Sequence, residues 1–132
     1  MKSLFLSFVG AMSLLAAVSA ESHHSFAAEF DVNRPVKLTG TVTKLEWTNP
    51  HAWVFIDAKD DSGKVQSWAV ELVGINDLLR RGWGRDRVKQ GDTINVDGFG
   101  AKNGTNTANA ASVTLANTGE LLWASVPRTE GN

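Results

Sequence analysis

Apolar and polar side chains alternate with a period of two over several stretches of this sequence. The longest stretch runs from residue 36 to residue 47 and is rich in β-branched side chains. Successive side chains of a strand point to opposite faces, so this period predicts a long first strand. Similar patterns predict further strands at residues 52–58, 65–72, 93–100 and 107–115.

Turn residues separate the first three predicted strands. Thr48, Asn49 and Pro50 end the first strand, because proline cannot donate to a strand ladder and asparagine favours turns. Residues 60–64 contain Gly63 at a position where a positive φ is useful, which predicts a hairpin turn. The first three strands are therefore expected to form a meander.

The hydrophobic period changes between the third and fourth predicted strands. Ile75 and Leu78 follow helical spacing, which predicts a short helix within residues 74–83. Three strands, a helix and two strands make up the order of a small OB-like five-stranded barrel, an all-β fold with one short helix. A sandwich of five or six strands is the alternative. Residues 21–35 form either a helical turn or an extended lead-in, and residues 117–123 fit a further small hairpin.

The start of the chain has the three parts of a secretory signal peptide. Lys2 gives a short positive start, residues 4–18 are mainly apolar, and small residues precede Ala20. We predict a leader at 1–20 and one domain at 21–132, located in a periplasm or secreted. The alternative is a membrane anchor, but the apolar run is shorter than the roughly 20 residues of a spanning helix. No membrane span is therefore expected in the mature form.

Charge and cysteine content exclude several kinds of site. The chain has 13 basic and 14 acidic residues, and loss of Lys2 with the leader changes the formal charge from −1 to −2. A negative domain at an exported address is not expected to bind nucleic acid. The chain has no cysteine, so disulfides, thiolate metal sites and cysteine nucleophiles are excluded.

Five short motifs resemble a family of small secreted bacterial proteins that is classed as a domain of unknown function. They are HHSF at residues 23–26, LTGTV at 38–42, EWTNPHAW at 46–53, LLRRGW at 78–83 and NTANA at 106–110. The resemblance implies an exported address and a barrel-like fold, and it implies no catalytic residue. The order of elements also resembles small periplasmic OB-fold proteins, which are more often binding modules than enzymes.

Two of the three histidines lie just after the predicted leader. Cleavage after Ala20 makes His23 the third residue, so the amine, two backbone amides and the imidazole could surround Cu(II) with four nitrogens. Cleavage after Ser22 makes His23 the first residue, and its amine and imidazole could bind copper together with His24 or His51. The alternative is a flexible polar tail, or a His24 ring that packs on the barrel.

His51 follows the predicted turn and lies between two tryptophans in the sequence. It is either a structural histidine bonded to a backbone carbonyl or a ligand to a metal or small molecule. Trp47 and Trp53 bracket the turn and are candidates for a binding surface, with Asn49 between them. Tryptophans that fill the core are the alternative.

Charged residues supply weaker candidates. Glu71 lies on the third predicted strand, where an outward-facing side chain is the favoured interpretation. If it is buried, it needs a partner such as Arg80, Arg81 or a metal. These arginines begin a basic cluster that ends at Lys89, and acidic residues nearby favour a solvated face over an anion site.

Residue spacing gives no support for catalysis. No pair of carboxylates is spaced for acid–base chemistry, and no serine stands in a nucleophile elbow. We predict an exported, non-catalytic binding protein that holds Cu(II) at its processed N-terminus. The alternative is an interaction module whose turn, with Trp47, His51 and Trp53, docks an unknown protein or small ligand in the cell envelope.

Overall fold

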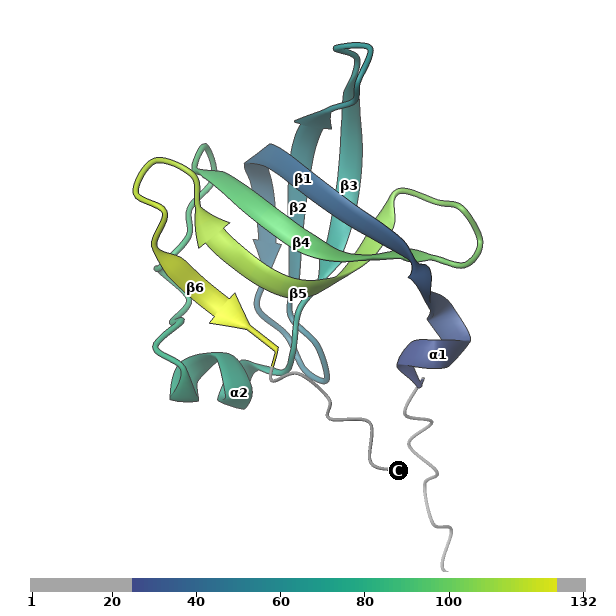
Figure 1. The fold of residues 1–132 in the computed structure, drawn as a ribbon. Helices are drawn as coiled ribbons and strands as arrows, with labels where there is room; N and C mark the ends of the chain where they lie inside the picture. The colour runs from purple at the N-terminus through teal and green to yellow at the C-terminus, as the bar shows by residue number, and fades with distance from the viewer. Residues whose placement is uncertain (1–24, 126–132) are drawn as a thin grey trace, which may run out of the picture.

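The computed structural model describes residues 25–125 (Figure 1). Six strands and two short helices follow one another as α1 (Phe26–Glu29), β1 (Phe30–Glu46), β2 (Trp53–Lys59), β3 (Val65–Glu71), α2 (Ile75–Arg80), β4 (Thr93–Ala101), β5 (Thr107–Leu115) and β6 (Leu121–Ala124). The predicted order of three strands, a helix and two strands is confirmed. Outside that set, the structure has α1 and β6, at the positions where the sequence offered a helical turn and a further small hairpin.

The strands form a sheet that closes on itself. Their order is β3-β2-β1-β4-β5-β6, and a parallel pairing of β3 with β5 joins the two sides. Strands β1 to β5 therefore make a ring in which each strand has two neighbours, the arrangement of an OB-type fold. This closure confirms the predicted fold class over the sandwich. Strand β6 adds an antiparallel partner to the second half of β5.

Strand β1 connects the two halves of the ring. Its first part pairs with β4 and its last part with β2, and Gly40 pairs with both. A Cβ atom at Gly40 would lie 2.8 Å from the backbone oxygen of Asp57, so no larger residue fits at this crossing without a shift. The close approach of β2 is therefore a steric reason for glycine at position 40.

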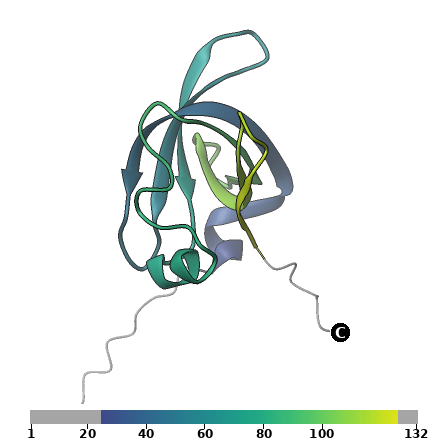
Figure 2. The ribbon, with the colours of Figure 1, turned by 90° about the vertical axis from the view of Figure 1, so that its left-hand side faces the viewer.

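The interior of the ring is filled by the inward-facing residues of the strands. Val54, Ile56 and Ala58 alternate with partly exposed neighbours along β2, as the period of two predicts. Helix α2 lies across one end of the ring (Figures 1 and 2), where Leu78 and the following Trp83 join the core. Each fully buried large apolar side chain contributes about 1.5–3 kcal/mol, so a chain without disulfides is held together by packing.

The segment before residue 36 differs from the sequence prediction of the first strand. Strand β1 begins at Phe30, directly after α1, so the lead-in is both a helical turn and a strand. The ring of Phe26 stacks on Phe30 and meets Phe99 edge-on, with 5.7 Å between centroids in each pair. These aromatic contacts fasten α1 to the outside of the sheet, and no periodic pattern signals them.

The predicted leader at 1–20 lies outside the described residues, and the predicted domain at 21–132 extends beyond them at both ends. Between residues 25 and 125, no helix has the length and apolar character needed to cross a bilayer.

Candidate functional site

A row of cross-strand neighbours follows the outer face of the ring. Glu46 pairs with Trp53, Trp53 with Glu71, Glu71 with Asn109, and Asn109 with Phe99. Residues paired in this way project from the same face of a sheet. The row therefore brings together side chains from five strands that are far apart in the sequence.

Glu71 lies at the centre of this row and is buried, with 6% of the residue exposed. Its Oε1 atom lies 3.1 Å from Nδ1 of His51 and accepts a hydrogen bond of 3.3 Å from Nδ2 of Asn109. We call these three residues the His51–Glu71–Asn109 cluster. Glu71 faces outward from the ring, as the favoured interpretation expected, but it is not solvated. Strand β3 lies between two paired strands at this point, and the β1–β2 loop brings His51 over the carboxylate.

The contact fixes which nitrogen of His51 faces outward. Nδ1 is the ring nitrogen that lies against the carboxylate, so Nε2 is on the far side of the ring from Glu71. A carboxylate only accepts hydrogen bonds, so Glu71 favours the form of His51 that carries a proton on Nδ1. The His51 side chain is 43% exposed. The cluster thus offers a held imidazole with its Nε2 available for a ligand.

The β1–β2 loop is held against the start of α2. Asn49 accepts a hydrogen bond of 3.2 Å at Oδ1 from the backbone N–H of Ile75. The backbone N–H of Ala52 donates to the carbonyl of Val73 over 3.1 Å. Asn49, predicted as a ligand-binding residue, therefore has a structural contact that positions the loop carrying His51.

The two tryptophans that bracket the loop differ in their surroundings. Trp47 is partly buried and packs against the hydrophobic core. Trp53 is partly buried at the start of β2 and lines a hollow of about 300 Å³ on the outer face. Of the pair, Trp53 lies beside the candidate site, as the cross-strand neighbour of Glu71.

The arginines of α2 do not join the cluster. Arg80 pairs with Asp77 on the same helix. Arg81 donates from Nη1 to the carbonyl of Ala124 over 2.5 Å and lies 6.0 Å from the ring centre of Trp123. The expectation that a buried Glu71 pairs with Arg80 or Arg81 is wrong, because both side chains turn toward other partners. Arg81 links α2 to β6.

The rest of the basic cluster surrounds an open hollow in the loop before β4. Two aspartates line it together with the basic side chains, and its full lining is Gly84, Arg85, Asp86, Arg87, Lys89 and Asp92. Arg87 also pairs with Glu120. This mixture of charges agrees with the predicted solvated face.

Of the three histidines predicted as metal ligands, one lies in the part of the chain that the structure describes. His51 belongs to the cluster, whereas His23 and His24 lie outside the described residues. A search of residues 25–125 finds no group of three or more histidine or acidic side chains that could hold a metal ion.

Sequence reasoning missed Asn109 and the packing of α1. Asn109 lies in the NTANA motif, but its role depends on the parallel pairing of β3 with β5. Such pairings join distant segments and leave no local signal.

Comparisons with known proteins supply no activity for this site. No curated protein matches the sequence. The mitochondrial single-stranded DNA binding protein Rim1 from S. cerevisiae matches with a TM-score of 0.48 and 10% identity, over 62% of this chain and 92% of that one. A ZRD-deleted mutant of TiaS, solved in complex with agmatine, matches with a TM-score of 0.47 and 20% identity, over 62% of this chain and 21% of that one.

The family comparison agrees with the resemblance found in the sequence motifs. A family model covers residues 12–110, which include the whole of the β1–β2 loop and the three residues of the His51–Glu71–Asn109 cluster. The chain belongs to this family of unknown function, DUF6152.

Proposed function

We propose that this protein is an exported, non-catalytic metal-binding protein that holds a copper ion with His51 and with His23 or His24. The observation that carries the proposal is the pair of His51 and buried Glu71, 3.1 Å apart. Protein histidines that bind metals usually donate their second ring N–H to a carboxylate or carbonyl, which orients the ring and makes the ligating nitrogen more basic. Glu71 and Asn109 supply such support for His51.

The position of α1 supports a contribution from the N-terminal histidines. Phe26 packs on Phe99, whose cross-strand neighbour Asn109 hydrogen-bonds Glu71. His24 and His23 precede Phe26 by two and three residues in the sequence. Helix α1 is thus the described element that follows the two histidines, and its Phe26 contacts the outer-face row that contains the cluster.

The available ligands suit copper. Imidazole, amine and deprotonated amide nitrogens favour Cu(II) in a tetragonal arrangement. Thiolate ligands, which favour Cu(I), are absent because the chain has no cysteine. The copper would be bound for storage, delivery or protection, and we propose no turnover. The proposed location is a periplasm or the exterior of the cell, with no nucleic acid as partner.

The first experiment determines the mature mass of the exported protein and titrates it with Cu(II), with visible absorption and tryptophan fluorescence as readouts. We expect a first residue of Glu21 or His23 and stoichiometric binding that His51→Ala and His23→Ala each weaken strongly. Glu71→Gln should weaken it about 10–100-fold, the usual effect of losing a partner that orients a metal ligand. Glu46→Ala, on the same outer-face row, is the matched control.

Each other outcome has a definite meaning. Binding lost in His23→Ala but unchanged in His51→Ala would assign copper to the free N-terminus alone and overturn the shared site. A blank titration would overturn copper binding. The second candidate function, docking of an envelope protein through the β1–β2 loop, would then be the better supported one. Asn49 and Pro50 of this loop are exposed to solvent and could contact a partner.

A further inference from the structure

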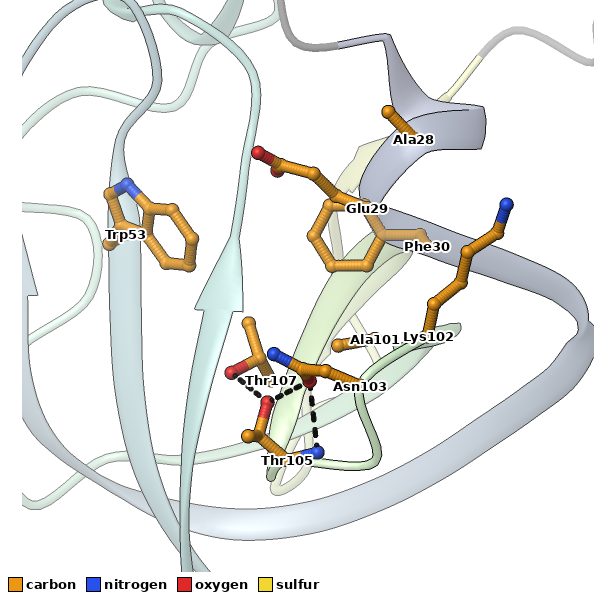
Figure 3. A pocket seen from close by; sticks show the side chains of 9 residues that line it. All are labelled: Ala28, Glu29, Phe30, Trp53, Ala101, Lys102, Asn103, Thr105 and Thr107. Carbon is orange, nitrogen blue, oxygen red and sulfur yellow. Dashed lines mark hydrogen bonds between the residues drawn. The ribbon is translucent and has the colours of Figure 1, made fainter.

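The hollow beside Trp53 is a second feature of the outer face. It lies between α1, the start of β2 and the loop from β4 to β5, and Figure 3 shows its lining. The residues around it are Ala28, Glu29, Phe30, Trp53, Ala101, Lys102, Asn103, Thr105 and Thr107. Its volume of about 300 Å³ is at the small end for ligand pockets, which run from about 300 to 1,000 Å³.

Aromatic side chains form two of its sides. Trp53 lies on one side and Phe30 on the other (Figure 3). Phe30 is buried, and its ring stacks on Phe26 with 5.7 Å between centroids. Trp53 is held in the sheet between Glu46 and Glu71. Both aromatic walls are therefore fixed before any ligand arrives, which lowers the entropic cost of binding.

A chain of polar groups lies at the base of the hollow. Oδ1 of Asn103 accepts hydrogen bonds from the backbone N–H and the hydroxyl of Thr105, over 3.1 and 2.7 Å. The hydroxyls of Thr105 and Thr107 lie 3.1 Å apart. These contacts use the oxygen of the Asn103 amide, so its nitrogen is left to donate to a ligand. The single hydroxyl proton of Thr105 is directed to Asn103, so Thr107 donates to Thr105 and its own hydroxyl oxygen is left to accept a hydrogen bond.

The charges around the hollow balance. Glu29 is acidic, and Lys102 is basic with its Nζ donating to the carbonyl of Ala27. The Glu29 carboxylate lies on the side toward Trp53 (Figure 3). A phosphate is disfavoured because its negative charge would lie close to this carboxylate. A purely apolar ligand is disfavoured because it would displace water from the polar side chains at the base without replacing their hydrogen bonds. A neutral ligand with one apolar face and several hydroxyls fits both conditions.

We propose that this hollow binds one ring of a neutral saccharide. The carbon-bound hydrogens of a pyranose give it an apolar face that packs on an aromatic side chain, here Trp53. Its hydroxyls accept a hydrogen bond from Asn103 and donate to the hydroxyl oxygen of Thr107 and to a carboxylate such as Glu29. None of the residues that line the hollow is a proposed copper ligand, so this proposal does not rest on metal binding.

The test is saturation-transfer NMR on the full exported chain in the presence of EDTA, with cellobiose, maltose and N,N′-diacetylchitobiose as probes. We expect at least one disaccharide to receive transfer, and its Kd to rise about tenfold or more in Trp53→Ala. Phe55→Ala, two residues along the same strand and outside the hollow, should leave the Kd unchanged. Thr107→Val should weaken binding several-fold, and Thr114→Val on the same strand should not.

A tetrasaccharide of the disaccharide that binds separates two sources of the sugar. Equal Kd values indicate a free small sugar, whereas tighter binding of the tetrasaccharide indicates a polysaccharide that continues beyond the hollow. Absence of transfer to all three disaccharides would overturn the proposal. Equal binding in Trp53→Ala and Phe55→Ala would overturn it too. Circular dichroism of each variant separates loss of binding from loss of folding.

Discussion

The turns at the two ends of β2 are built in different ways. At residues 60–64 the contacts are local: Oδ1 of Asp60 accepts from the backbone N–H of Ser62 and of Lys64, and Gly63 has a φ of 82°. At residues 48–52 one contact is local, because the hydroxyl of Thr48 donates to the carbonyl of His51 over 3.2 Å. The others are distant: Asn49 accepts from Ile75 at the start of α2, and His51 lies 3.1 Å from Glu71 at the end of β3. The first turn needs only its own residues, and the second exists as a part of the whole fold.

This difference in contacts indicates that residues 60–64 only connect two strands, whereas residues 48–52 can form part of a binding site. A turn held by its own side chains tolerates change and places nothing against the rest of the protein. A loop held by distant partners positions its side chains with precision, which a binding site requires. The loop that carries His51 belongs to the second kind.

The largest expected effect follows from removing the carboxylate at the centre of the distant contacts. Glu71→Ala leaves the half-buried amide of Asn109 and Nδ1 of His51 without this acceptor, and loss of a partner by a buried polar group costs up to about 1–3 kcal/mol. Urea unfolding followed by tryptophan fluorescence should show a loss of this size. Glu46→Ala, which is more exposed and in the same row, should change stability by less than about 0.5 kcal/mol. Equal losses in the two variants would contradict the central role of Glu71.

Substitutions of two glycines, one at each turn, should have effects of intermediate size on stability. A Cβ atom at Gly74 would lie 2.9 Å from the backbone oxygen of Pro50, so Gly74→Ala forces the β1–β2 loop away from α2. Overpacking of this kind costs about 1–3 kcal/mol. Gly63 has nothing within 4 Å of a Cβ position, and asparagine tolerates a positive φ, so Gly63→Asn should cost less.

Urea midpoints measure both glycine variants, and Cu(II) titration adds a second readout. Gly74→Ala should also weaken copper binding, since the loop carries His51, whereas Gly63→Asn should not. A Gly63→Asn variant that is the less stable of the two would show that the local turn matters more than the distant one.

The smallest effect concerns the pH dependence of the local turn. The hydroxyl of Ser62 hydrogen-bonds the carboxylate of Asp60 and, with smaller contributions from the backbone N–H groups of Lys64 and Ser62, holds the pKa of Asp60 below its usual value. A folded-state pKa below the unfolded one stabilises the fold at pH values above the unfolded pKa. This stabilisation disappears as the pH falls through the lowered pKa.

Asp60→Ala should therefore have a slightly lower urea midpoint than the wild type at pH 7. The difference should shrink below about pH 4, the ordinary range for aspartate. A difference that stays constant down to pH 2 would mean that the charge of Asp60 has no part in the turn. Asp61→Ala, at an exposed neighbour, serves as the control.

The elements with local signals were predicted well. Strands β2 to β5 lie within one residue of their predicted limits, and α2 lies inside the predicted range of 74–83, because hydrophobic periods and turn residues are read directly from neighbouring positions. The start of β1 was predicted six residues late, since Phe26 and Phe30 act through contacts with each other and with Phe99. The candidate site was predicted in part: His51, Trp53 and Glu71 meet on one face, whereas Arg80 and Arg81 do not join them.

The sequence by itself determined the order of the elements, the hairpin at residues 60–64 and the absence of thiol chemistry. Each depends on residues that are neighbours in the chain or on composition alone. Only the tertiary structure decided that Glu71 is buried, that His51 and Asn109 are its partners, and that α1 and Trp53 enclose a hollow. These facts depend on ring closure through β3 and β5, which joins residues 38 positions apart. The burial of Glu71 and its contacts with His51 and Asn109 arise only when the ring of strands closes. The pattern of residues along the chain therefore does not reveal them.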